Sequence, residues 1–269
     1  DVARSVGAKV VIGGTSSHPY TQLGIIQEEN EKFGIKKMIE HPDVTIRKVD
    51  EFRTADFIFA ASEFVQKSML DSGIEKNKIK LVPTGADTKK FSPKRKSDNV
   101  FRVLFSGTVS IRKGVQYLLE AWEELDIDNS ELVFAGAIDK DTKKIISKFK
   151  KANVRYLGEV KDIERVYQEA SIFVFPSLEE GSAKVTYEAM ACGLPIITTF
   201  NSGSVATNGK EGFIIPIRNS KKIKDKILFL HKNKKKAKQM GDLARKTALK
   251  YDWSKYDKRF ISALKSILK

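Results

Sequence analysis

The chain has 269 residues, one cysteine and a net charge of +15 at pH 7, and 41% of its residues are hydrophobic. This composition is typical of a globular protein with one large or two modest domains. It excludes an internal disulfide, which needs two cysteines, and no apolar run approaches the ~18 residues that a membrane-spanning helix requires.

The positive charge is carried by lysines along the whole chain, including Lys221–Lys222 and Lys234–Lys236. Two interpretations stay open: a lysine-rich solvated surface, or attraction to an anionic membrane face. A nucleic-acid partner is not expected, because the sequence has no zinc-ligand spacing, no helix-turn-helix pattern and no pair of RNA-stacking aromatic residues.

Short apolar runs alternate with helix-type segments in the first third of the chain. Strands are predicted at residues 9–13, 57–61 and 80–83, and helices at 21–33 and 63–71. His18 lies in the polar loop that follows the first of these strands. The polar, basic segment 87–99 then contains Pro93, and we interpret it as a linker between two domains. An ordinary surface loop is the alternative interpretation.

The rest of the chain continues the alternation of strands and helices. Strands are predicted at 101–105, 132–135, 154–157, 172–175, 195–198 and 212–216, and helices at 115–125, 141–150, 162–169, 182–192, 220–231, 234–249 and 254–268. We expect Leu118, Leu119 and Trp122 to face inward, and Cys192 to be a small buried residue rather than a nucleophile. The alternation argues for a doubly wound parallel sheet.

The most informative segment is strand 172–175 with the loop and helix that follow it. The loop carries Glu180, Ser182 is expected to cap the helix, and Glu188 lies roughly one and a half turns into it. Open α/β sheets bind ligands at the carboxyl ends of their strands, and a helix start attracts anions. An anionic ligand with hydroxyl groups on both sides, such as a nucleotide sugar, fits this layout. The alternative is a solvated loop glutamate and a surface helix glutamate.

A second loop, from Gly107 to Gly114, also follows a predicted strand. Glycines at both ends let the backbone approach a ligand, while Arg112 and Lys113 can neutralise phosphate groups. By itself this pattern is weak, because loops at strand ends often carry glycine and lysine. Gly136 and Val160 lie in two further loops at strand ends, where simple turn residues are the alternative.

The dipeptides Pro176-Ser177 and Glu180-Gly181, with the run Glu188–Pro195, resemble the signature of family 4 glycosyltransferases. The resemblance implies an α/β fold of GT-B type, with two Rossmann-like doubly wound parallel-sheet domains, of which the first is incomplete. The implied divisions are 1–93 for the later part of the acceptor-side domain, 94–252 for the nucleotide-sugar domain, and 253–269 for a terminal helix packing back toward the first domain.

The resemblance also assigns roles to single residues. It implies that Glu180 contacts the transferred sugar, Glu188 binds the ribose hydroxyls and Lys113 contacts the diphosphate. The chain departs from the usual family pattern at 182–185 and at Thr108, where an arginine is common, so Arg112 is expected to supply the second phosphate contact. The implied donor-site residues are Gly107, Arg112, Lys113, Gly136, Val160, Glu180, Gly181, Ser182, Val185, Thr186 and Glu188.

His18 completes the implied catalytic set with Glu180 and Lys113. The match rests only on its position after a strand, where a family histidine faces the donor sugar across the cleft. A surface or turn histidine is the alternative.

The resemblance implies a glycosyltransferase that moves a hexose-type sugar from a UDP- or GDP-sugar to a glycan, lipid or other hydroxyl acceptor. It implies retention of anomeric configuration, no metal and no cofactor. We expect a cytoplasmic protein, peripheral at the inner membrane face, that associates with another copy or with a missing N-terminal segment. The alternatives are a donor-binding homologue or subunit without transfer activity, and a basic membrane- or polymer-binding protein.

Overall fold

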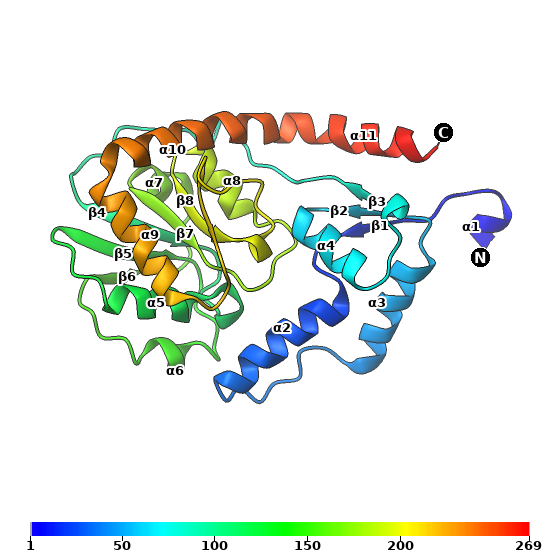
Figure 1. Ribbon diagram of the computed structural model, residues 1–269, viewed down its shortest axis with the longest axis horizontal. Coiled ribbons are helices and arrows are strands. Elements are labelled where there is room, and N and C mark those ends of the chain that lie inside the picture. Colours follow the sequence, from blue (N-terminus) through cyan, green and yellow to red (C-terminus); the bar gives the residue numbers. More distant parts are fainter. Residues whose placement is uncertain (1, 269) are drawn as a thin grey trace.

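The computed structural model describes residues 2–268, with side chains from residue 4 onward. Asp1 and Lys269, which bound the predicted first domain and terminal helix, lie outside the described residues. The described strands form two separate sheets, one of three strands and one of six (Figure 1). We call the three-stranded sheet with helices α1–α4 the first unit, and the six-stranded sheet with helices α5–α10 the second unit.

The first unit contains a parallel sheet in the order β1-β2-β3. Its elements are α1 (Val2–Ser5), β1 (Val11–Gly14), α2 (Pro19–Lys32), α3 (Pro42–Thr54), β2 (Phe57–Ala60), α4 (Glu63–Asp71) and β3 (Ile79–Leu81). The strands and helices predicted here are confirmed to within about two residues, but α1 and α3 were not predicted. In α3, charged residues make up six of the thirteen positions and separate the few apolar side chains, so no helix was assigned from apolar periodicity. Pro42 in the first turn and the His41 ring, which accepts from the Asp43 N–H at 3.3 Å, define its start.

The second unit contains a parallel sheet in the order β6-β5-β4-β7-β8-β9. Its elements are β4 (Phe101–Ser106), α5 (Val115–Glu123), β5 (Ser130–Ala135), α6 (Lys143–Ile146), β6 (Val154–Tyr156), α7 (Ile163–Gln168), β7 (Ile172–Phe175), α8 (Lys184–Ala191), β8 (Ile196–Thr199), β9 (Gly212–Ile215), α9 (Ser220–Lys232) and α10 (Lys234–Ala248). Helices α5, α6 and α9 pack together, as do α7, α8 and α10, on opposite faces of the sheet (Figure 1). The doubly wound parallel sheet is therefore confirmed.

The main hydrophobic core surrounds this second sheet. Leu118, Leu119 and Trp122 are at most 1% exposed and face inward as predicted. Cys192 is buried, and burial raises the pKa of its thiol to about 12, so its interpretation as a small core residue is confirmed. It forms the C-cap of α8, and the left-handed Gly193 after it completes a Schellman motif with Leu194.

Two predicted helices differ from those observed. The helix predicted at 141–150 is a single turn, α6, and the backbone N–H groups of Lys150 and Lys151 bond the Glu123 carboxylate instead of helix carbonyls. The helix predicted from Ser182 begins at Lys184, with Ala183 at the N-cap, so the capping role of Ser182 is wrong. The Ser182 hydroxyl instead lies 2.9 Å from the Tyr187 hydroxyl and bonds the Gly203 carbonyl.

The last helix connects the two units. α10 and α11 (Tyr256–Ile267) run along the top of Figure 1, from the second sheet to the first. The Phe260 ring meets the Phe59 ring of β2 edge to face at 5.3 Å, and Ile267 is buried beside them. The C-terminal helix therefore supplies part of the core of the first unit.

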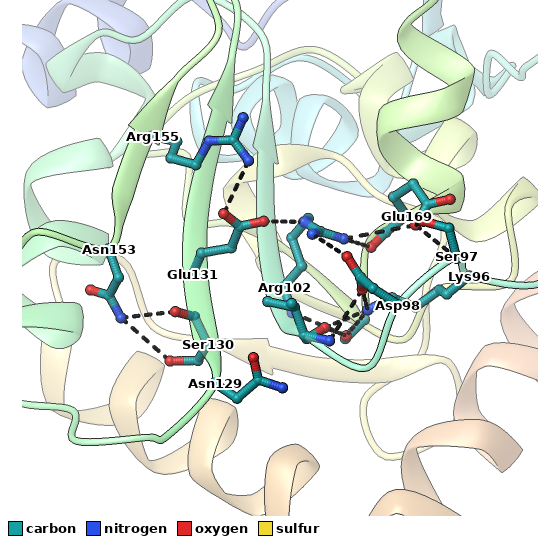
Figure 2. Close-up of polar contacts among 12 residues, drawn as sticks. Lys96, Ser97, Asp98, Arg102, Asn129, Ser130, Glu131, Asn153, Arg155 and Glu169 are labelled. Carbon is teal, nitrogen blue, oxygen red and sulfur yellow. Dashed lines mark hydrogen bonds and ion pairs between the residues drawn. The ribbon is translucent and has the colours of Figure 1, made fainter.

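A polar cluster anchors the irregular segment 82–100 where it enters the second unit. Figure 2 shows Arg102 of β4 bonded to Asp98 at 3.0 Å, to Glu131 of β5, and to the Glu169 carbonyl. Arg155 reaches the other oxygen of Glu131 at 3.2 Å. This cluster holds the amino ends of the strands, the edge of the sheet opposite the loops that follow β4 and β7.

Candidate functional site

The candidate site lies where the strand order of the second sheet reverses. β4 and β7 are neighbours, but the chain moves outward from them in opposite directions. The loops that follow them therefore diverge and leave a crevice at the carboxyl edge, the usual ligand site of a doubly wound sheet. A backbone hydrogen bond from the Leu178 N–H to the Arg112 carbonyl, at 2.9 Å, joins the two loops directly.

Close packing of these loops depends on glycine. Gly114 has a φ of +70°, and a Cβ there would lie 2.1 Å from the Pro176 carbonyl oxygen. Only glycine fits both the left-handed backbone and this approach. Gly107 lies under the Lys113 side chain, and Gly136 packs against the Gly107 carbonyl and bonds Gly158. Val160 lies half-buried two residues after Gly158.

The structure brings Glu180, Lys113 and Arg112 together. Glu180 Oε1 lies 3.3 Å from Lys113 Nζ and 3.4 Å from Arg112 Nη1. The Lys113 ammonium also lies over the Phe175 ring, 5.4 Å from its centroid. The two cations predicted to hold phosphates thus face the carboxylate predicted to contact the sugar. Phosphate oxygens entering here would find two positive groups already positioned.

Glu179 was not given a role by the sequence, yet it is fully buried. The Ser17 hydroxyl donates to its Oε1 at 2.9 Å, and Gln22 Nε2 and Arg112 Nη1 donate to its Oε2 at 3.0 and 3.2 Å. Ser17 and Gln22 belong to the first unit and Arg112 to the second. Glu179 therefore joins the two units directly behind Glu180. Its position beside Glu180 in the same loop was the only available signal.

Other contacts of the same loop define a seam between the units. A Cβ on Gly181 would lie 1.7 Å from the Thr15 carbonyl oxygen, so no larger residue fits. The Ser62 hydroxyl donates to the Gly181 carbonyl, and Thr84 and Ser182 share a hydrogen bond of 3.1 Å. The loop after β7 therefore packs against the first unit and against the segment that follows β3. The crevice lies at the junction of the two units.

Glu188 lies on α8, where its Oε2 accepts a hydrogen bond of 2.9 Å from the Tyr167 hydroxyl. Burial raises the pKa of Glu188. Thr186 is buried and donates to the Ala183 carbonyl at 2.7 Å, while Val185 is half-buried. Glu188 is therefore a partly desolvated carboxylate with one protein donor.

His18 immediately precedes α2 and is 2% exposed. Its ring packs against Tyr20 and Phe52, with centroids 5.5 and 6.2 Å away, and burial lowers its pKa. Its Nδ1 has no hydrogen-bond partner among the described residues. In residues 2–268, no hydrogen bond or ion pair joins His18 or Glu188 to Glu180, although Ser17 beside His18 contacts Glu179.

No group of three or more His, Cys, Asp or Glu side chains between residues 2 and 268 is arranged to hold a metal ion. Within the same residues, none of the helices has both the length and the apolar character needed to cross a membrane.

Comparison with known proteins points to one family. The family model described as "Glycosyl transferases group 1" matches residues 86–247. An uncharacterized glycosyltransferase of Methanocaldococcus jannaschii is 27% identical over 205 residues, covering 75% of this chain and 57% of that protein. The N,N'-diacetylbacillosaminyl-diphospho-undecaprenol alpha-1,3-N-acetylgalactosaminyltransferase of Campylobacter jejuni is 29% identical over 230 residues, covering 79% of this chain and 61% of that protein. The chain thus spans about three fifths of the length of these relatives.

Solved structures share the arrangement of both units. Sucrose-phosphate synthase of Thermosynechococcus elongatus matches with a TM-score of 0.80 at 17% identity, over 99% of this chain and 70% of its own. Anabaena HepE, solved with UDP and glucose, matches with a TM-score of 0.71 at 18% identity, over 91% of this chain and 76% of its own. At these identities the likeness shows the fold, and the predicted α/β fold of GT-B type is confirmed.

Proposed function

This chain belongs to the group 1 glycosyl transferases, and on that premise we propose that it moves a hexose-type sugar from a nucleoside diphosphate sugar to a hydroxyl group of a glycan or lipid acceptor. Within the group we assign it to family 4, because Glu180, Glu188 and the run to Pro195 keep the motif of that family. The grouping of Glu180, Lys113 and Arg112 at the strand-order reversal is the observation that carries the proposal.

Each predicted residue has a role in this proposal. Lys113 and Arg112 bind the diphosphate in exchange for their present contacts with Glu180, which then hydrogen-bonds the sugar. Glu188 accepts hydrogen bonds from the ribose hydroxyls. The donor pocket is lined by the surrounding backbone and side chains of Gly107, Gly136, Val160, Gly181, Ser182, Val185 and Thr186. His18 positions the sugar from the first unit, next to Ser17 at the seam.

In the proposed reaction, the bond between the anomeric carbon and the β-phosphate oxygen breaks. A bond from the same carbon to the acceptor oxygen forms, and the acceptor hydroxyl gives its proton to the leaving diphosphate. Lys113 and Arg112 stabilise the negative charge that develops on this leaving group. We propose that no metal or cofactor takes part, because two protein cations already face the expected phosphate position. We propose retention of configuration, because an acceptor hydroxyl that gives its proton to the leaving diphosphate attacks from the face on which that group departs.

Two relatives guide the choice of substrates. HepE was solved with UDP and glucose, which favours a UDP-sugar here, and a GDP-sugar is the competitor. The Campylobacter jejuni relative is named for a diphospho-undecaprenol acceptor, which favours a lipid-linked glycan. We place the reaction in the cytoplasm, at an anionic membrane face to which the net charge of +15 would attract the protein.

Thermal unfolding with UDP, GDP, ADP or dTDP tests the donor site. A nucleotide at about 100 times its dissociation constant should stabilise the folded protein by roughly 2.7 kcal/mol. Glu188→Gln and Lys113→Gln should each remove this gain. Glu120→Gln on α5 is the control, since Glu120 is also half-buried with a pKa raised by burial. A folded protein that no nucleotide stabilises would contradict the proposal.

A donor-binding subunit without transfer activity is the second candidate. It is favoured by one observation, that the expected catalytic residue His18 is only 2% exposed and packs against Tyr20 and Phe52. Such a subunit would show the nucleotide-dependent gain but would release no UDP from a UDP-sugar, with or without acceptor. A coupled UDP-release assay therefore separates it from the transferase.

A further inference from the structure

Two cavities meet beside the predicted diphosphate site. The inner one, of about 350 Å³, is lined by Thr108, Ser110, Arg112 and Lys113 of the second unit and by side chains from α2 and the segment after it. The outer one, of about 600 Å³, lies between α2 and α3. Asn30, Ile35, Lys37 and Ile39 line both. The two cavities therefore form one groove that leads away from the site, which we call the α2–α3 groove.

Most of the exposed surface in the outer part of the α2–α3 groove is apolar, although Glu31, Lys36 and Glu40 also line it. Its lining includes Tyr20, Leu23, Ile35, Met38, Ile39 and Ile46. Met38 is 71% exposed, Tyr20 59% and Ile46 54%. Single exposed apolar residues are common, but several lining one groove mark a surface that binds an apolar group.

The inner part of the groove is charged. Lys37, Arg112 and Lys113 face Asp139 and Asp141 there. Asp139 Oδ2 accepts hydrogen bonds from the Asp141 N–H, at 3.2 Å, and from the Thr142 hydroxyl. Lys37 Nζ forms an ion pair with Asp141 Oδ2 at 3.2 Å. The Lys37 side chain is 62% exposed, and an exposed pair of this kind is weak. Lys37 can therefore exchange Asp141 for a phosphate.

We propose that the α2–α3 groove binds the acceptor, and that this acceptor is an amphiphile with an apolar chain and a phosphate or diphosphate head. The chain lies along Met38 and Ile46, and the head lies at Lys37. Sugar attached to the head would then project toward Glu180 and Lys113, where the donor is bound. This assignment rests on the proposed function, because it names the acceptor of that same site. The outer end of the groove is mostly apolar, and the inner end carries Lys37, Arg112 and Lys113. This arrangement fits one amphiphilic molecule that spans both ends.

Chain-length selectivity is the direct test. Farnesyl diphosphate and isopentenyl diphosphate carry the same head on fifteen-carbon and five-carbon chains, and each can be titrated calorimetrically into the protein saturated with UDP. Each methylene buried should strengthen binding about fourfold. We expect farnesyl diphosphate to bind at least about tenfold more tightly, because the burial of two methylenes already strengthens binding by more than this factor. Equal affinities, or no binding of either compound, would overturn the proposal.

Matched variants locate the binding. Ile46→Gln should reduce the selectivity for the longer chain, whereas Ile261→Gln on α11, where the side chain is 48% exposed, should leave it unchanged. Lys37→Gln should weaken both compounds by a similar factor. Lys67→Gln removes an exposed lysine that is likewise paired with an aspartate, Asp71, and should weaken neither. Losses equal to those of the controls would overturn the assignment to this groove.

Repeating the titrations without UDP separates the two proposals. Intact selectivity in a protein that binds no nucleotide would contradict the donor site and leave the groove assignment standing. Nucleotide binding without selectivity would contradict the groove and leave the donor site. A dimer that dissociates on Ile46→Gln would assign the groove to a second copy of the chain, and would also overturn the proposal.

Discussion

Glu188 occupies a position that is unfavourable for a charged group. It has one protein donor, the Tyr167 hydroxyl, and burial raises its pKa. A carboxylate selected for stability would have more partners or more water. Unfavourable burial of an ionisable group in a ligand crevice is a recognised feature of functional sites.

The first prediction concerns the pH dependence that Glu188 causes. A raised folded-state pKa means that the folded protein binds this proton more readily than the unfolded chain does. The stabilising contribution is therefore present below the ordinary glutamate pKa and is lost as the pH rises through the raised value. Glu188→Gln should raise the Tm relative to wild type, and by more at pH 8 than at pH 5.

Scanning calorimetry at the two pH values checks this expectation. Glu159→Gln, which removes one exposed charge near Val160, is the control and should show no such difference. A Glu188→Gln protein that is less stable at pH 8 than wild type would show that the carboxylate is structural.

The second prediction separates two adjacent glutamates. Glu179 is fully buried and accepts from three side chains, so Glu179→Ala should cost about 3 kcal/mol of unfolding free energy. Glu180 is 17% exposed and faces the crevice. In Glu180→Gln, Arg112 keeps its bond to Glu179 and Lys113 keeps its contact with the Phe175 ring, so the variant should cost only about 1 kcal/mol but greatly reduce sugar transfer. Urea unfolding and a transfer assay on both variants provide the measurements. Equal stability losses would contradict this division of roles.

At the level of elements, the amino edge of the second sheet is held by the Arg102 cluster of Figure 2. Arg102 is 9% exposed and bonds groups from β5, from the segment before β4 and from the end of α7. The cluster is on the edge away from the crevice. It is therefore expected to serve stability and not ligand binding.

The third prediction follows from that position. Arg102→Met should cost about 3 kcal/mol, because it leaves Glu131 and Asp98 without their main partner. Arg155→Gln removes the exposed partner of the same Glu131 and should cost less than about 1 kcal/mol. Urea midpoints at unchanged slope measure both. Nucleotide affinity should be unaltered in both variants, and a loss of affinity would place the cluster in the binding machinery.

At the level of the whole molecule, α2 of the first unit is bonded to the second unit through Glu29, which is 1% exposed. Tyr117, Gln116 and Arg218 each donate to its carboxylate at 2.7 Å. Burial and the nearby Glu29 raise the pKa of Tyr117, so its hydroxyl stays protonated as a donor. This contact and Glu179 hold the crevice together from two sides.

The fourth prediction tests this contact. Arg218→Leu should lower the unfolding free energy by about 2 kcal/mol, because the Glu29 charge loses its cation while keeping two neutral donors. Small-angle X-ray scattering should give a larger radius of gyration as the units separate. Lys224→Gln, which breaks an exposed pair with Glu124 within the second unit, is the control. An unchanged radius would mean that the seam at Glu179 is sufficient.

Much of the fold was determined by sequence that acts locally. Apolar runs and helix punctuation by residues such as Gly73 and Gly193 predicted nearly every element, because burial pattern and backbone conformation depend on neighbouring residues. The order of elements also predicted the positions of three site features. The glycine-bounded loop 107–114 and Glu180 follow strands, and Glu188 lies on the helix after the second of these strands.

Tertiary structure alone decided what those residues meet. Three features involve groups more than 20 positions apart in the sequence. They are the burial of Glu179 beside Ser17, the hydrogen bond from Ser182 to the Gly203 carbonyl in place of a helix cap, and the packing of the His18 ring against Phe52. So does the α2–α3 groove, which forms only when α3 folds beside α2 and the second unit closes its inner end. Periodicity reports which face of an element is buried, but it cannot report which distant side chain covers that face.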